Sequence, residues 1–189
     1  MNVWETLEGH FTFPDFYRWL ALQAFAFENR GSLRFVEVGV LGGQSAAFLA
    51  QVLAENRPSA RLDLVDTWPN GFESVRAALS PFAGVIGEWH QGISWEVAQE
   101  YDDVSVDAVF LDADHDYESV ARDIAAWRPK LRPYGILAGH DYTPEIPGVI
   151  RAVTEAFDKV HVMRGERFTG PKRDQKPGNY YPVWFVRLP

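Results

Sequence analysis

Residues 35–45 read FVEVGVLGGQS, and this stretch decides the fold that we expect for the rest of the chain. A short apolar run over 33–38 ends in Gly39, and two adjacent glycines precede a helical pattern over 44–55. The pattern predicts a strand, a tight turn and a helix, with glycines where the backbone turns sharply or approaches a ligand. Taken alone, the same glycines also fit an ordinary strand-to-helix turn.

The alternation of strands and helices continues along the chain. Further strands are expected at 62–65, 85–90, 106–111, 136–138, 159–163 and 181–188, helices at 13–29, 117–131 and 149–157, and a turn at 133–135. The first of these helices is rich in aromatic residues and has Pro14 in its first turn. We therefore expect an α/β fold with a Rossmann-like, doubly wound, mainly parallel seven-stranded sheet, an antiparallel C-terminal strand pair and an N-terminal aromatic helix. Ligands of such sheets bind beyond the carboxyl ends of the strands.

Length and composition favour one domain. The chain has 189 residues, of which 47% are hydrophobic, and this is enough for a single core over 1–189. Within it we expect a helical cap over 1–30 and a mobile insertion over 164–179, which is rich in Gly, Pro and charged residues. The aromatic residues of the cap suit either a homodimer interface or burial within one chain.

The same composition excludes several classes of protein. A net charge of −8 leaves no basic surface for a phosphate backbone, so we expect no nucleic-acid partner. The absence of cysteine removes disulfides, thiolate metal sites and cysteine nucleophiles. No apolar stretch is long enough to span a bilayer, and acidic residues stand where a signal peptide would be basic. We therefore expect a cytoplasmic protein that acts on a small molecule and has no membrane partner.

The glycine spacing indicates the type of cofactor. Dinucleotide-binding loops follow G-x-G-x-x-G, whereas here the spacing from Gly39 is G-x-x-G-G, with Glu37 two residues before it. A carboxylate at this point repels a pyrophosphate but suits the ammonium of a methionyl group, which favours S-adenosylmethionine. Asp66, at the end of the next strand, is expected to accept the ribose hydroxyls, or else to cap the helix that follows. Trp68 is either an adenine platform or a core residue.

A second polar cluster follows the buried strand over 106–111. Residues 110–117 read FLDADHDY, and His140 and Asp141 follow the next strand along the chain. Consecutive late strands are neighbours in this fold, so the two clusters should converge. Carboxylates with imidazole suit a hard divalent ion such as Mg²⁺ or Mn²⁺ better than zinc. Asp116 is expected to cap the helix after it, whereas Asp114 fits either a turn or the site.

Together these residues resemble the class I methyltransferases, specifically the small family typified by macrolide-sugar O-methyltransferases and, more distantly, the catechol-type O-methyltransferases. The resemblance covers roughly residues 33–157. Its motifs are Val36-Glu37-Val38-Gly39, Asp66, Gly92-Ile93-Ser94, Leu111-Asp112-Ala113-Asp114-His115-Asp116-Tyr117, Leu131-Arg132-Pro133-Tyr134-Gly135 and Gly139-His140-Asp141-Tyr142. Relatives often carry Gly-Gly at 134–135 and an acidic residue at position 140, so this chain departs from the pattern at both places.

The resemblance implies the roles of individual residues. Asp112 and Asp141 are expected to bind a divalent cation, with His140 as the third ligand, and His115 is expected to be the general base. Ser94 is expected to contact adenine. The full set expected to bind S-adenosylmethionine is Glu37, Gly39, Gly42, Gly43, Ser45, Asp66, Thr67, Trp68, Gly92, Ser94 and Asp112.

The expected function is an S-adenosylmethionine-dependent, cation-assisted O-methyltransferase that acts on a sugar, polyol or phenol hydroxyl. Two alternatives stay open at this point. One is a module that binds the cofactor without turnover, and the more remote one is a nicotinamide-dependent oxidoreductase.

Overall fold

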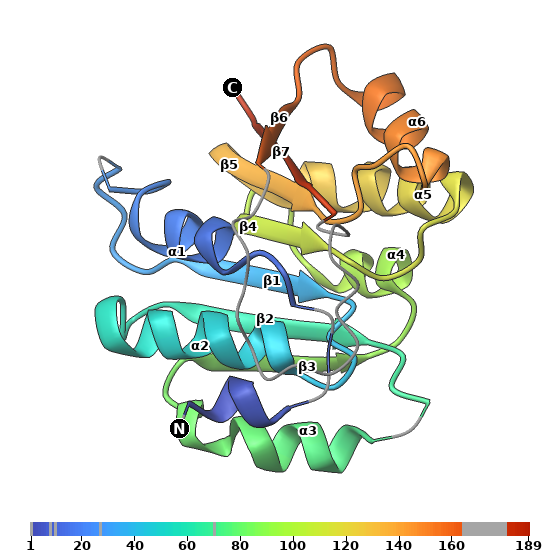
Figure 1. Ribbon diagram of the computed structural model, residues 1–189. Coiled ribbons are helices and arrows are strands. Elements are labelled where there is room, and N and C mark those ends of the chain that lie inside the picture. The colour runs from blue at the N-terminus through green and yellow to red at the C-terminus, as the bar shows by residue number, and fades with distance from the viewer. Residues whose placement is uncertain (1, 8, 10, 27, 70, 164–180) are drawn as a thin grey trace.

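A seven-stranded sheet forms the centre of the protein (Figure 1). The computed structural model describes all residues except 1, 8, 10, 27, 70 and 164–180, so the insertion predicted over 164–179 lies outside the described residues. The described strands are β1 (Arg34–Val38), β2 (Arg61–Asp66), β3 (Ile86–Gln91), β4 (Val106–Leu111), β5 (Leu131–Gly139), β6 (His161–Met163) and β7 (Val183–Arg187). Their order is β3-β2-β1-β4-β5-β7-β6. Strands β1 to β5 are parallel, whereas β7 pairs antiparallel with both β5 and β6.

Helices cover both faces of the sheet (Figure 1). The described α-helices are α1 (Pro14–Leu22), α2 (Gln44–Asn56), α3 (Phe72–Leu79), α4 (Ser94–Val97), α5 (Tyr117–Trp127) and α6 (Pro147–Ala156), and the short 3-10 helices are η1 (Val3–Thr6), η2 (Ser80–Phe82), η3 (Ala98–Glu100) and η4 (Arg128–Lys130). One core cluster joins the sheet to α1, α2 and α3, and a second joins it to α4, α5 and α6. The predicted Rossmann-like fold, with its antiparallel C-terminal pair and aromatic N-terminal helix, is confirmed.

The central strands are buried because helices cover the sheet on both faces. Every residue of β4 is buried, as expected for a parallel strand between two helical layers. Strand β1 lies between β2 and β4, and β4 lies between β1 and β5. The loops that leave β1, β4 and β5 at their carboxyl ends are therefore neighbours.

The aromatic helix is shorter than the sequence pattern predicts. The apolar spacing indicated a helix over 13–29, but α1 ends at Leu22. The guanidinium of Arg57 donates to the carbonyl oxygens of Ala21 and Leu22, so a distant side chain satisfies groups at the end of the helix. Beyond this point Phe25 packs edge-on against Phe35 of β1, with 1% of its surface exposed.

A second difference concerns the start of β5. The sequence pattern extended a helix to Leu131 and placed a turn at 133–135, whereas Leu131 begins the strand and this segment is a bulge within it. Val106 and Ala108 of β4 pair with Leu131 and Ile136 of β5, so β5 has more residues than β4 between the same two pairs. Proline cannot donate a hydrogen bond to the ladder, which favours a bulge here.

Burial within the chain accounts for the described aromatic residues of the N-terminal region. Phe13, Phe16 and Tyr17 are at most 2% exposed, and all three contact the ring of Phe110 on β4. This is one of the two roles that the sequence allowed for them. Among the described residues no helix is both long enough and apolar enough to cross a membrane.

Candidate active site

Two polar clusters lie side by side at the carboxyl ends of β4 and β5. Leu111 pairs with Gly139 across the two strands, and the amide of His140 donates to the carbonyl of Leu111 over 3.2 Å. Asp112 leaves the sheet next to it, and its amide donates to the carbonyl of Val38 on β1. The predicted convergence of the two clusters is confirmed.

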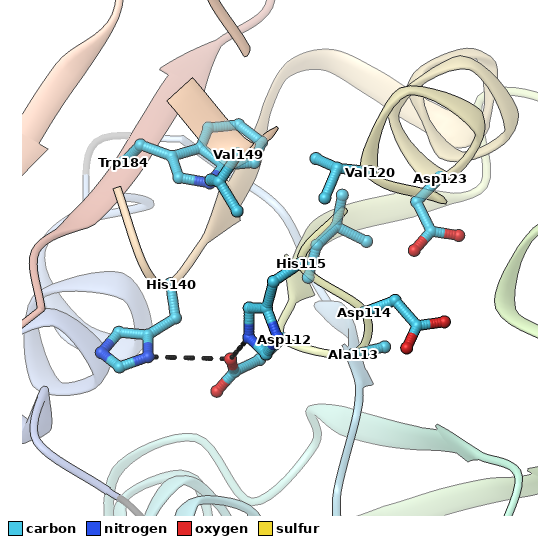
Figure 2. Close-up of a pocket in the computed structure, with 10 residues that line it drawn as sticks. Asp112, Ala113, Asp114, His115, Val120, Asp123, His140, Val149 and Trp184 are labelled. Carbon is cyan, nitrogen blue, oxygen red and sulfur yellow. Dashed lines mark ion pairs between the residues drawn. The ribbon is translucent and has the colours of Figure 1, made fainter. Parts of the chain in front are cut away.

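Two carboxylates and two imidazoles meet at this point. Nε2 of His115 lies 2.5 Å from Oδ2 of Asp141 and 3.8 Å from Oδ1 of Asp112. Nδ1 of His140 lies 3.2 Å from Oδ1 of Asp141 and 3.7 Å from Oδ1 of Asp112. Figure 2 shows the Asp112 carboxylate between the two rings. The His115 side chain is 43% exposed and that of His140 only 6%, so His115 is the one that a substrate can reach.

The charges of the cluster depend on one another. Hydrogen bonds to Asp112 and Asp141 raise the pKa of His115 to about 10, against the opposing effect of burial. Burial lowers the pKa of His140, but the same two carboxylates outweigh it and bring this pKa to about 9. Burial also raises the pKa of Asp141, yet hydrogen bonds from both histidines outweigh it and hold that pKa below its usual range. Without a bound cation, the two imidazoles are therefore charged at neutral pH.

The cluster has the dimensions of a cation site. Asp112, His115 and Asp141 each offer one ligand atom, and these atoms all lie within 4.8 Å of one another. Two ligands on opposite sides of Mg²⁺, each at about 2.1 Å, lie about 4.2 Å apart, so atoms that are up to 4.8 Å apart would have to move slightly closer together to bind one hard cation. The predicted third ligand, His140, also directs Nδ1 at both carboxylates. Its role as a ligand stays a prediction.

Close backbone packing positions the loops that carry these groups. Gly39 has φ +86°, and a Cβ atom at this position would lie 2.0 Å from the carbonyl oxygen of Asp112. A Cβ at Gly148, in the first turn of α6, would lie 2.6 Å from the carbonyl oxygen of His115. Asp141 itself adopts φ +59°, a left-handed conformation that aspartate tolerates better than most residues. Glycines on two other elements thus allow the chain to hold Asp112 and His115 in place.

The predicted ammonium-binding acid is buried beneath the glycine loop. Glu37 is 1% exposed, its Oε1 accepts a hydrogen bond from Ser45, and its Oε2 accepts none from the described residues, although the buried Tyr17 hydroxyl lies close enough to lower the pKa of this carboxyl group. Burial raises the pKa of Glu37 to about 8; the Ser45 hydrogen bond opposes this shift, and the charge of Asp112 adds to it. The free oxygen is a polar atom that a cationic group could satisfy.

Asp66 holds the glycine loop. Its Oδ2 accepts hydrogen bonds from the amides of Val40 and Leu41, both at 2.8 Å, and its Oδ1 accepts one from the amide of Trp68. Helix α3 begins later and has Gly71 at its N-cap, so the alternative role of Asp66 as the cap of this helix is wrong. A ribose contact would be made in addition to these backbone contacts.

The remaining predicted cofactor residues differ in accessibility. Thr67 is exposed, whereas Trp68 is 3% exposed and its ring packs against Phe72 and Trp89. The structure thus places Trp68 in the core, the alternative that the sequence left open. Ser94 is 7% exposed, and its hydroxyl accepts a hydrogen bond from Nε1 of Trp127.

Asp123 and Thr12, which lie near the site, were not predicted from the sequence, whereas Asp116 was correctly predicted as a helix cap. Asp123 is 3% exposed and interacts with the Ser94 hydroxyl, and burial raises its pKa to about 6. Its position on the apolar face of α5, three residues after Val120, was a signal for burial. Thr12, whose hydroxyl lies 3.1 Å from Nε2 of His140, had no local signal. The predicted cap is confirmed, since Asp116 accepts from two amides in the first turn of α5.

Comparison with known proteins identifies a family to which the chain is similar. A family model described as "Methyltransferase domain" matches residues 36–142. No curated protein sequence matches the chain.

Three solved structures illustrate the similarity of the fold. A SAM-dependent O-methyltransferase from Thermotoga maritima is 16% identical, with a TM-score of 0.67 over 96% of this chain and 67% of the other. A TDP-rhamnose 3′-O-methyltransferase of calicheamicin biosynthesis is 20% identical, with a TM-score of 0.65 over 92% and 77%. An rRNA methylase from Streptococcus thermophilus is 15% identical, with a TM-score of 0.64 over 93% and 94%. At these identities the likeness shows a shared fold.

Proposed function

The chain belongs to the methyltransferase-domain family and is an S-adenosylmethionine-dependent methyltransferase, and from this premise we propose that it methylates a hydroxyl group of a small molecule with the help of a divalent cation. One observation carries the proposal: Asp112, His115, His140 and Asp141 converge where the loops of β4 and β5 meet. In a sheet of this type that edge is where ligands bind.

The residues around the glycine loop suit the cofactor. The Oε2 of Glu37 would accept a hydrogen bond from the ammonium group of the cofactor, and Asp66 would accept hydrogen bonds from its ribose hydroxyls in addition to those from the glycine loop. Ser94 lies next to the loop after β3, where we place the adenine. When bound, the cofactor supplies an electrophilic methyl group. The chain binds and orients it, and positioning of this kind accounts for much of the rate of a transfer reaction.

The carboxylate pair suits a hard cation. Asp112 and Asp141 would hold it, with His140 as third ligand, and the positive charge would favour ionisation of the acceptor hydroxyl. The histidine departs from the acidic residue that similar enzymes often carry at this position, and imidazole softens a site toward Mn²⁺.

His115 is proposed as the general base. It is the more exposed imidazole of the pair, and one of its ring nitrogens would take the proton of an acceptor hydroxyl. Its high pKa is caused by Asp112 and Asp141. A divalent cation bound to these two carboxylates would neutralise their charge. The pKa of His115 would then return toward the ordinary imidazole value of about 6.5, and His115 could accept a proton at neutral pH.

A small-molecule acceptor is favoured over RNA. The net charge of −8 opposes binding to a phosphate backbone, although one similar fold is that of an rRNA methylase. The similarity to a TDP-rhamnose O-methyltransferase supports sugars as the first acceptors to test.

We also place residues 1–30 as a cap within one domain, because the described aromatic residues there pack on the sheet.

The test uses chelator-treated protein and cofactor with a labelled methyl group. Nucleotide sugars, polyols, catechols and rRNA are offered as acceptors, each with and without Mg²⁺ or Mn²⁺. We expect transfer to a small-molecule hydroxyl that is lost in excess chelator and restored by the cation. Asp112→Asn should abolish transfer, whereas Asp158→Asn, a change at an exposed carboxylate in the loop after α6, should leave it intact.

Each part of the proposal can fail separately. Full transfer in excess chelator would remove the cation from the mechanism, and transfer to rRNA alone would overturn the acceptor class. Cofactor binding without transfer to any acceptor would favour a binding module instead.

A further inference from the structure

The imidazole of His140 is held by groups from distant parts of the chain. Its Nδ1 faces the carboxylates of Asp112 and Asp141, at 3.7 and 3.2 Å. Its Nε2 lies 3.1 Å from the hydroxyl oxygen of Thr12, a residue 128 positions away. One face packs against the ring of Phe13, with 4.6 Å between ring centroids. Both nitrogen atoms of this imidazole therefore have defined partners.

Thr12 is itself firmly placed. Its neighbours Phe11 and Phe13 are 5% and 2% exposed, and the Phe13 ring packs at 4.8 Å from that of Phe110 on β4. The amide of Phe11 donates to the side chain of Gln44, at the start of α2. Because both flanking residues are buried and a β-branched side chain has few rotamers, the hydroxyl is presented with little loss of entropy.

We propose that Thr12 is a positioning residue of the active site, whose hydroxyl holds the His140 ring in the orientation that directs Nδ1 at the carboxylate pair. A half-turn of the ring would exchange each nitrogen with a carbon. The contact with Thr12 and the contact with the carboxylates are therefore kept together or lost together. The N-terminal segment then contributes a polar group to the site in addition to covering the sheet.

The consequence rests on the proposed function, since it takes the carboxylate pair to be the cation site. A partner that orients a group next to a metal typically changes metal affinity by about 10- to 100-fold when it is removed. Thr12→Val removes the hydroxyl and keeps the shape of the side chain, whereas Thr12→Ser keeps the hydroxyl. A matched control is Thr6→Val, because the Thr6 hydroxyl donates to the carbonyl of Val3 at an exposed site.

The first measurement is Mn²⁺ binding to the cofactor-free protein, followed by electron paramagnetic resonance of free Mn²⁺. We expect Thr12→Val to weaken binding by about 10- to 100-fold, and Thr12→Ser and Thr6→Val to bind like the wild type. If Thr12→Ser loses as much affinity as Thr12→Val, packing and not the hydroxyl is responsible, and the inference is overturned.

The second measurement needs no metal. Nitrogen-15 spectra of labelled histidine report both ring nitrogens of His140, which His140→Gln assigns by difference. Thr12→Val should shift these signals and Thr12→Ser should restore them. A wild type that binds no Mn²⁺ would refute the cation part of the proposed function, while the spectra still decide on Thr12. Unchanged signals together with unchanged Mn²⁺ affinity in Thr12→Val would overturn the inference alone.

Discussion

Binding of the cofactor is expected to expel a proton from Glu37. The carboxyl group is buried, and its pKa is raised to about 8, so most molecules carry this proton at neutral pH. If the cofactor's ammonium pairs with the free Oε2, the charged form is strongly favoured and the pKa falls below neutrality. The proton then leaves as the cofactor binds.

The magnitude follows from the pKa. A group with a pKa of about 8 is about 90% protonated at pH 7 and about 10% protonated at pH 9. Cofactor binding should therefore release about 0.9 proton at pH 7 and about 0.1 at pH 9 from this group. Removing the Ser45 hydrogen bond, which lowers this pKa, should extend the release to higher pH.

Calorimetry in buffers of different ionisation enthalpy measures the release directly, with S-adenosylhomocysteine as a stable ligand. The ligand's own amino group also titrates in this range, so the informative quantity is the difference between wild type and Glu37→Gln. We expect this difference to be about 0.9 proton at pH 7, and Ser45→Ala to raise the release at pH 9. Equal proton release by wild type and Glu37→Gln would refute the pairing and leave Glu37 as a buried structural acid.

Three further predictions concern the base, a buried acid and the opposite end of the sheet. His115→Ala should lower turnover by about 10²- to 10⁴-fold in steady-state assays with cofactor affinity unchanged, and a loss below tenfold would point to another base, such as the exposed Asp114. Burial raises the pKa of Asp123 from 3.8 to about 6, so its contribution to stability is present below pH 3.8 and lost as the pH rises through 6. Urea unfolding should show the stability of the wild type falling by about 2 kcal/mol relative to Asp123→Asn between pH 4 and pH 7, and parallel pH curves would contradict this. Asp107 is wholly buried at the amino end of β4 and accepts hydrogen bonds from Arg30, Arg132 and the amide of Arg34. Asp107→Asn should therefore lower the free energy of unfolding in urea by about 3 kcal/mol without changing cofactor affinity. A change near zero would show that these arginines do not need the Asp107 carboxylate.

The parts of the fold that follow a local pattern could be predicted. The strand over 106–111 was placed at the bounds of β4, because a continuous apolar run between turn residues has few other solutions. The meeting of Asp112 with His140 and Asp141 followed from strand order alone, since parallel neighbours end at the same edge. Asp116 was recognised as a helix cap from its place before a helical period.

Two outcomes depended on a partner from another part of the chain. The aromatic period continued to residue 29, but α1 ends where the guanidinium of Arg57 binds its last carbonyl groups. The sequence left Trp68 open between an adenine platform and a core residue, and its packing against Phe72 and Trp89 decided for the core. No pattern within either segment records these contacts.

The sequence by itself determined the alternating α/β fold, the glycine turn and the acidic residues at the strand ends, because these depend on periodicity, turn chemistry and the order of parallel strands. Only the tertiary structure decided which atoms of those residues are engaged. It buried Glu37 with one free oxygen, attached Asp66 to the glycine loop and brought Thr12 to the ring of His140. Such contacts join residues that are distant in the chain, and packing geometry, which no local spacing encodes, selects them.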